Sequence, residues 1–469
     1  MKHKTILSAI IYLADAELFF ALVFSSFPDL WKVVLAIATI TFGGWLLAQV
    51  HGWKSYFGIN IIHGGWGLKA MKKFASKRPN LARLIADVGA GVGYGTVYSL
   101  ITFGKKSERK KLAVMLFLSL LFSLLLAAGS ISSQSGLLSD PRFLAILACG
   151  MVGGLALQSL AVLAVSAINI LTVPNAPAGA QLLIVGVTVP WEWVFGLVIA
   201  ATIHEFAHGV LCKVEKLRVL GSGTVLWGFL PIGAFVEPDE EKFKHITLKK
   251  KRRILAAGPA ANLLAFIGFT MLSIGFAATA GPAYSSMSAV KVLSVNSTAY
   301  PGSGQLVAGD IITSVDGERV VGITGLAGAI SDKKQGDTMV LTTQNGDKTV
   351  TVGDKNKIGI SVLPAATAGN EIIFATLGFV MTVLASTAYI NVAIGAINLV
   401  PLFVTDGARI VSEELNAAFS QLLGKKKGPP FAAKLSLFAS AAALLLILVN
   451  LALPSVLRML ASLTGFLIP

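Results

Sequence analysis

Three residues near the middle of the chain, His204, Glu205 and His208, form the pattern His-Glu-x-x-His. On a helix, histidines four residues apart project from the same face, one turn above the other. Such a face can supply two imidazole ligands to a tetrahedral zinc ion, and Glu205 is placed to act on a water molecule at the metal rather than to bind the metal. The alternative is a pair of core histidines satisfied by hydrogen bonds. The chain has only 6 histidines among 469 residues, which makes a chance pattern rare.

The chain that leads into this motif is apolar. The run Trp193 to Ile203 directly precedes His204, so the motif is predicted to lie inside a membrane helix. Ionisable side chains are costly within a bilayer and usually serve a function where they occur. The setting therefore favours a metal site over a structural pair of histidines.

Composition indicates a membrane protein with many spans. Hydrophobic residues make up 54% of the chain and charged residues 13%, and the mean hydropathy is +0.74. Soluble proteins carry about 25% charged residues. Apolar segments long enough to span a bilayer occur near residues 5–25, 32–50, 112–131, 142–171, 191–212, 254–280, 372–400 and 432–453. We expect a multi-pass integral protein of the cell membrane, with the lipid bilayer as a partner.

The net charge of +15 is interpreted through loop topology and anionic lipid. Basic residues crowd the region 72–111, which is predicted to be a cytoplasmic loop. Within it, the Gly-rich segment 84–103 has basic flanks on both sides and is predicted to be re-entrant or to lie on the membrane surface. No basic stripe with interleaved aromatic residues occurs in the sequence, so no nucleic-acid partner is expected. The two cysteines, Cys149 and Cys212, indicate neither a disulfide framework nor a cysteine-based zinc site.

A Gly- and Val-rich stretch, residues 219–236, follows the histidine motif. Its pattern predicts short extended segments or a hairpin rather than a spanning helix. Polar backbone at membrane depth is tolerated only where protein buries it or where it lines a wet cavity. An extended edge beside the metal site can also pair with a strand of substrate.

The segment 286–364 is polar, β-branched and rich in turns, unlike the apolar segments on either side. The pairs Asp316-Gly317 and Asn345-Gly346 predict tight turns between short strands. We therefore expect a soluble β-rich domain inserted between two membrane helices. Residues 300–317, which contain the pattern Gly-Asp-x-Ile-x-x-x-Asp-Gly, resemble a bacterial-type PDZ domain. That resemblance implies a peptide or protein ligand added to a sheet edge; the alternative is a small β domain of another kind.

A catalytic zinc site needs three protein ligands and a water molecule, so two histidines leave one ligand missing. The missing ligand is expected to be a carboxylate in another apolar segment. Asp406 is such a carboxylate, at the end of Asn-Leu-Val-Pro-Leu-Phe-Val-Thr-Asp-Gly, residues 398–407. Pro401 and Gly407 are expected to break or kink this helix and so let Asp406 turn toward the interior of the helix bundle.

Together these motifs resemble the site-2 protease family of intramembrane zinc metalloproteases. The resemblance covers about residues 187–409. It rests on His-Glu-Phe-Ala-His at 204–208, on Gly-Pro-Ala-Ala-Asn at 258–262, on the PDZ-like insert and on residues 398–407.

This resemblance implies roles for six residues and a Zn²⁺ cofactor. The predicted zinc ligands are His204, His208 and Asp406. Glu205 is implied as the general base and later proton donor. Asn262 and Asn398 are implied to shape the site or to hold substrate backbone; the alternative is that both are polar groups that pack helices together.

The predicted fold is a polytopic α-helical membrane protein with an inserted β-rich, PDZ-like domain. We expect four parts: an N-terminal membrane domain of several helices (1–180), the first half of the catalytic membrane core (181–282), the PDZ-like domain (283–366), and the second half of the core (367–469). The expected activity is hydrolysis of peptide bonds within or next to the transmembrane segments of membrane-anchored proteins. The alternative is a membrane transporter or metal-handling protein whose histidine and carboxylate ligands form an ion path.

Overall fold

The computed structural model describes residues 2–23, 25, 27, 29–65, 67–130, 139–173, 179–180, 188–296, 300, 305–354 and 357–465. The chain forms two compact units, one of residues 1–268 with 386–469 and the other of residues 269–385. The boundaries between the units fall within two helices, α9 (Leu248–Ser286) and α11 (Glu371–Ile397). The segment predicted as an insert lies inside the second unit, while the four-part division remains a prediction.

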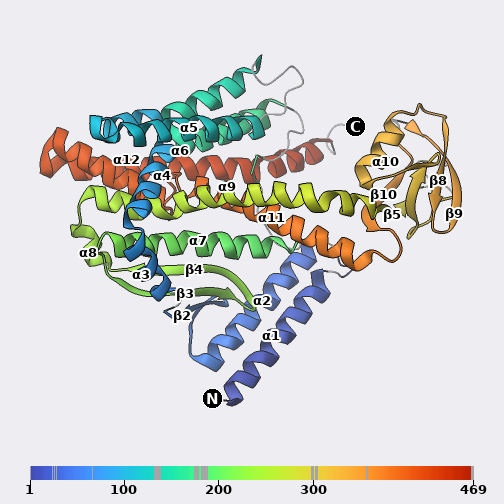
Figure 1. Ribbon diagram of the computed structural model, residues 1–469, viewed down its shortest axis with the longest axis horizontal. Helices are drawn as coiled ribbons and strands as arrows, with labels where there is room; N and C mark the ends of the chain where they lie inside the picture. The colour runs from blue at the N-terminus through green and yellow to red at the C-terminus, as the bar shows by residue number, and fades with distance from the viewer. Residues whose placement is uncertain are drawn as a thin grey trace. The chain divides into compact units, whose positions relative to one another are not determined.

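Helices dominate the first unit (Figure 1). They are α1 (Lys2–Val23), α2 (Asp29–His51), α3 (Leu68–Lys77), α4 (Pro79–Phe103), the short 3₁₀ helix η1 (Lys106–Glu108), α5 (Arg109–Ser130), α6 (Pro141–Thr172), α7 (Trp193–Val214), α8 (Glu240–His245) and α12 (Asp406–Gly465). Helices α9 and α11 extend into the second unit. Of all the helices in the described residues, nine are long and apolar enough to cross a membrane. Each of the eight predicted apolar segments corresponds to one of these nine.

The ninth such helix is α4, which covers the segment 84–103; the prediction that this segment is re-entrant or lies on the membrane surface stays a prediction. Its glycines permit close helix packing. A Cβ atom on Gly89 would lie 2.2 Å from the Cβ of Ala260 on α9, and one on Gly93 would lie 2.6 Å from Leu399. The Gly-rich segment therefore provides a packing face of α4.

Two of the membrane helices are broken where they cross. Gly95 in α4 has φ 78° and Gly154 in α6 has φ 66°, and neither residue is helical. A Cβ on Gly95 would lie 2.3 Å from the backbone nitrogen of Gly154, and the reverse distance is 2.4 Å. Both the positive φ and the backbone contact require glycine at these positions.

A buried cluster of ion pairs joins α4 and α5 to the helices that carry the histidine motif and the Gly-Pro-x-x-Asn motif. Asp87 on α4 is 1% exposed and pairs with Lys111 and Arg253 at 2.8–2.9 Å. Glu215, just after α7, pairs with Arg253 at 3.3 Å and with Arg83 at 2.9 Å. Because removal of one partner would leave a buried charge uncompensated, this cluster fixes the N-terminal helices against the rest of the unit.

An antiparallel four-stranded sheet lies beside α7. Its strands are β1 (Lys54–Tyr56), β2 (Ile59–His63), β3 (Val219–Trp227) and β4 (Leu230–Pro238), in the order β1-β2-β3-β4. The pair β3–β4 confirms the extended segments predicted after the histidine motif. The strands β1 and β2 were not predicted. They lie more than 150 residues upstream of β3, so their pairing with it leaves no local pattern in the sequence. Helix α7 packs against β4, and Figure 1 shows the strand running along the helix.

The second unit contains the predicted β-rich segment. Its elements are β5 (Ser288–Val295), β6 (Ile311–Val315), β7 (Glu318–Arg319), α10 (Gly322–Ser331), β8 (Thr338–Thr343), β9 (Gly346–Thr351) and β10 (Ile360–Ala366). The sheet order is β10-β5-β6-β8-β9, with β7 paired to β6. Asp316 and Gly317, at φ 51° and 79°, form the tight turn between β6 and β7 that the sequence predicted.

Candidate metal centre

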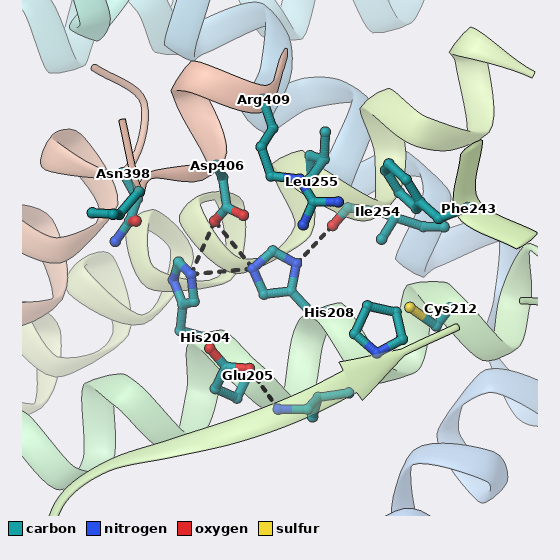
Figure 2. Close-up of a pocket in the computed structure, with 13 residues that line it drawn as sticks. His204, Glu205, His208, Cys212, Phe243, Ile254, Leu255, Asn398, Asp406 and Arg409 are labelled. Carbon is teal, nitrogen blue, oxygen red and sulfur yellow. Dashed lines mark hydrogen bonds and ion pairs between the residues drawn. The ribbon is translucent and has the colours of Figure 1, made fainter. Parts of the chain in front are cut away.

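Three side chains from two distant helices converge in the first unit. The Nε2 atoms of His204 and His208, on α7, lie 3.1 Å apart. Oδ2 of Asp406, the first residue of α12, lies 3.1 Å from each of them. Figure 2 shows the three groups facing one another. In the described residues, this is the one group of three or more His, Cys, Asp or Glu side chains whose ligand atoms come close enough to share a metal ion.

The hydrogen bonds of the two rings determine which nitrogen atoms carry protons. Nδ1 of His204 lies 2.6 Å from Oδ1 of Asn262, and Nδ1 of His208 lies 2.7 Å from the carbonyl oxygen of Ile254. Both partners accept hydrogen bonds, so each neutral ring donates from Nδ1. The amide of Asn262 is oriented in turn, because its Nδ2 donates to the carbonyl of Ala200 and to Oδ1 of Asn391.

Each Nε2 therefore presents a lone pair to the other and to a carboxylate oxygen. Three electron-pair donors 3.1 Å apart repel one another unless a cation lies between them. In a tetrahedral site with metal–ligand distances of about 2.0–2.1 Å, ligand atoms lie about 3.3 Å apart. Two neutral imidazoles and one carboxylate at this spacing fit a zinc ion with a fourth position open for water or substrate.

Glu205 stands beside this group without joining it. Its Oε2 accepts a hydrogen bond of 2.8 Å from the backbone N–H of Val236 on β4. Because that N–H points away from β3, the free edge of β4 faces the metal centre. Figure 2 shows Glu205 between the histidine pair and this strand.

Gly258 on α9 lies against the two ligand rings. A Cβ atom at this position would lie 2.4 Å from Nε2 of His208 and 2.6 Å from Nε2 of His204. Any larger residue would occupy the space where the ligand atoms converge. The Gly-Pro-x-x-Asn motif thus provides two features of the centre: room for the ligands at Gly258 and a hydrogen-bond acceptor for His204 at Asn262.

A turn between α11 and α12 positions Asp406. Helix α11 ends at Ile397 and α12 begins at Asp406. The helix is therefore interrupted here, as we expected from Pro401 and Gly407. Thr405 caps α12, since its Oγ1 accepts from the N–H of Ala408 at 3.2 Å. Its hydroxyl also donates to the carbonyl of Val400 at 2.6 Å, which ties the turn together.

The close return of the chain in this turn requires glycine at 407. The N–H of Gly407 donates to the carbonyl of Asn398 at 2.7 Å. A Cβ on Gly407 would lie 2.3 Å from the carbonyl oxygen of Leu399. The turn also contacts the N-terminal helices, because the hydroxyl of Tyr94 on α4 donates to that same carbonyl at 3.2 Å.

A cavity of about 210 Å³ opens onto the three ligand groups and Glu205. The apolar part of its wall is formed by Val236, Pro238, Phe243, Ile254, Leu255 and Val404. Asn398 lines the cavity, and its Nδ2 donates to the carbonyl of Ile394 on its own helix. The structure thus brings all six predicted site residues to one place, with Asn262 behind His204 and Asn398 at the cavity wall.

Sequence reasoning missed three residues of this region. Asn391 holds Asn262 from inside α11, and nothing in its local sequence indicates this contact. Arg409 lines the cavity one turn after Asp406. Thr405 was recognisable, since a threonine directly before an acidic residue and a new helix is a typical cap signal.

Comparison with known families matches residues 192–447 to peptidase family M50. The matched stretch is more than half of the chain and contains all six predicted site residues. This chain therefore belongs to peptidase family M50, the site-2 protease family, and is an integral, multi-pass membrane protein.

The chain is also similar to the uncharacterized protein MJ0971 of Methanocaldococcus jannaschii. The two are 28% identical over 261 residues, which is 55% of this chain and 65% of that protein. The chain thus spans about two thirds of the length of this curated relative.

Proposed function

We propose that this protein is an intramembrane zinc metalloprotease of the site-2 type, which hydrolyses peptide bonds within or next to transmembrane segments of membrane-anchored proteins. One observation carries the proposal: the unprotonated Nε2 atoms of His204 and His208 and a carboxylate oxygen of Asp406 meet at 3.1 Å beside Glu205. Membership of peptidase family M50 supports the same activity.

The proposed mechanism assigns each residue one task. His204, His208 and Asp406 would hold a zinc ion, which would supply Lewis-acid polarisation of the scissile carbonyl and activation of water near neutral pH. Glu205 takes the proton from the attacking water through its carboxylate and later gives a proton to the leaving amine, so that the C–N bond breaks and two peptides result. The N–H of Val236 holds Oε2 of Glu205, and Oε1 has no hydrogen-bond partner among the described residues.

The substrate is proposed to bind as a strand on β4. A membrane helix satisfies all of its backbone hydrogen bonds internally, so it must unwind before water can reach a peptide bond. The free edge of β4 offers N–H and C=O groups to such an unwound segment. Strand pairing at this edge would carry the scissile bond past Glu205, whose carboxylate contacts Val236 in the same strand.

The second unit is proposed to be a PDZ-like domain that binds a peptide or protein ligand. The edge strand β10 and helix α10 flank a groove of about 530 Å³. Ile323, Leu326 and Ile330 of α10 form its apolar wall, and residues 357–359 also line it. An extended peptide could pair with β10 and place alternate side chains in this groove.

The proposed setting is regulated intramembrane proteolysis in the cell membrane. By resemblance to site-2 proteases, the substrates would be membrane-anchored transcription factors, anti-sigma-type regulators or remnant signal peptides. Each of these has a membrane segment that a strand-capturing site beside a membrane helix can accept.

The test is cleavage of single-span model peptides by the purified full-length protein, combined with metal analysis. The peptides carry helix-weakening Gly or Asn residues at different depths of the span. Glu205→Gln should retain zinc near the wild-type level and lower cleavage by about 10²–10⁴-fold, the range typical of general acid–base catalysis. Glu237→Gln is the matched control, because Glu237 is an exposed residue next to Val236 on the same strand and lies outside the cavity wall.

Two outcomes would contradict the proposal. Loss of zinc together with cleavage would make Glu205 a structural residue of the metal site. Full cleavage by Glu205→Gln would exclude the proposed chemistry, and a metal-transport assay in vesicles would then be the next experiment.

A further inference from the structure

Arg409 reaches the cavity from the side opposite Glu205. It stands three residues after Asp406 in the first turn of α12, so both side chains leave the same face of the helix. Figure 2 shows Arg409 above the histidine pair and Glu205 below it. Among the described residues that line the cavity, Arg409 is the one lysine or arginine.

Among the described residues, one nitrogen of the guanidinium has a hydrogen-bond partner. Nη2 donates to both carboxylate oxygens of Glu240 at 3.0 and 3.2 Å. The guanidinium also lies over the ring of Phe243, with 4.7 Å from Cζ to the ring centroid. Within the described residues, Nε and Nη1 have no partner. Arginine–carboxylate pairs that serve structure often use two nitrogen atoms in a fork, whereas here that fork remains open.

These contacts fix the group without neutralising it on the cavity side. Glu240 has 54% of its side chain exposed, so solvent screens its pairing with Arg409. On the cavity side, the neighbouring Ile254 and Leu255 are buried, while 42% of the Arg409 side chain is exposed. A donor that is already oriented beside the reacting groups can stabilise a negative charge that develops during a reaction.

We propose that Arg409 is a catalytic residue that donates hydrogen bonds to the scissile carbonyl oxygen as it becomes negative during attack by water. This inference rests on the proposed protease function. Glu205 would take the proton of the water on one side of the ligand group. Arg409 would stabilise the oxyanion from the other side, with the metal-binding residues between them. Glu240 and Phe243 orient the guanidinium and do not contact substrate.

The experiment compares Arg409→Gln, Arg409→Lys and Glu240→Gln in the full-length, zinc-loaded protein. Three quantities are measured: kcat and KM on a cleavable single-span peptide, the affinity for a phosphinic analogue of that peptide, and zinc content with thermal unfolding. The phosphinic group imitates the tetrahedral oxyanion, so its binding reports the proposed contact without turnover.

Arg409→Gln should lower kcat by about 10²–10³-fold, as removal of an oxyanion donor does elsewhere, and leave KM within a few-fold. Affinity for the phosphinic peptide should fall by a similar factor, while zinc content and the unfolding temperature stay near wild type. Arg409→Lys keeps the charge but lacks the fork, so it should recover part of kcat. Glu240→Gln removes the charge of the ion pair but keeps an amide oxygen that can accept from Nη2, so the guanidinium stays oriented and kcat should fall much less than in Arg409→Gln.

Several results would overturn the inference. An equal loss of kcat in Glu240→Gln and Arg409→Gln would assign the effect to the ion pair. A rise in KM at constant kcat would limit Arg409 to ground-state binding. Unchanged affinity for the phosphinic peptide in both Arg409 variants would show that Arg409 does not contact the oxyanion. A wild-type protein that cleaves no peptide would contradict the proposed function instead, which keeps the two failures distinct.

Discussion

Oδ1 of Asn262 accepts a hydrogen bond from Nδ1 of His204 at 2.6 Å, across a separation of 58 residues in the chain. This bond fixes both the orientation of the ring and the position of its proton, and so leaves Nε2 as an electron-pair donor. Asn262 is itself held by the carbonyl of Ala200 and by Asn391, and neither asparagine is exposed to solvent. The metal centre therefore depends on a buried polar network that spans α7, α9 and α11.

The first prediction concerns this network. Asn262→Ala should weaken zinc binding by about 10–100-fold, the usual effect of removing a residue that orients a ligand. Competition with a chromogenic chelator measures the affinity directly. Asn262→Asp retains an acceptor for His204 and should lose less affinity than Asn262→Ala. Equal affinity in Asn262→Ala and wild type would show that the ring is oriented by other contacts.

The second prediction concerns the third ligand. Purified wild-type protein should hold about one zinc ion per chain, and Asp406→Ala should lower that occupancy sharply, because a site of two histidines lacks a ligand. Elemental analysis after dialysis against a weak chelator gives the occupancy. His204→Ala and His208→Ala should behave in the same way. Full occupancy in Asp406→Ala would mean that another carboxylate completes the site.

The third prediction concerns Gly258. Gly258→Ala places a methyl group 2.4–2.6 Å from the ligand nitrogens, so zinc occupancy and cleavage should both be lost. Gly268→Ala is the matched control, since Gly268 lies in the same helix with no atom within 4 Å of the added Cβ. An alanine in that open helical position should be neutral or slightly stabilising. Normal zinc content in Gly258→Ala would contradict the packing described above.

The fourth prediction concerns the pH dependence of the second unit. Burial would raise the pKa of Asp310, but hydrogen bonds from Lys348, Val307 and Asn345 hold that pKa below its ordinary value. The folded pKa lies below the unfolded one, so Asp310 contributes its full stabilisation above the unfolded pKa of about 3.9. That contribution is lost as the pH falls through the folded pKa.

Hydrogen exchange of residues 288–366 in the full-length protein tests this prediction. Protection should be constant near neutral pH and should decline below about pH 4. Asp310→Asn should reduce protection at neutral pH and flatten the acid decline. Asp347→Asn, at an exposed position on β9, should change neither. An acid decline of the same size in Asp310→Asn would assign it to other carboxyl groups.

Local sequence patterns determined the features that depend on neighbours in the chain. The spacing of His204 and His208 places both on one face because a helix turns every 3.6 residues. Long apolar segments identified eight of the nine candidate spans in the described residues, because a run of about 20 apolar residues is long enough to cross a bilayer as a helix. Pairs such as Asp316-Gly317 predicted turns in the second unit because their backbone favours positive φ.

The motif around Asp406 named the third ligand through its resemblance to a family, but the sequence could not show that its carboxylate meets the histidines. That meeting joins atoms 198 and 202 residues apart and depends on how α12 packs against α7. The basic flanks of the segment 84–103 predicted a re-entrant or surface-lying piece, whereas the contacts of its glycines with Ala260 and Leu399 depend on packing that no local pattern reveals.

Tertiary structure alone decided which residues surround the ligands. Asn391 supports Asn262, Gly258 leaves room for two imidazoles, and Arg409 faces the same cavity as Glu205. In the same way, β1 and β2 from the N-terminal region complete the sheet whose far edge borders the site. Helices and strands follow a regular period along the chain, so a sequence pattern can predict them. The convergence of distant side chains depends on how helices and strands pack together, and this packing has no period along the chain.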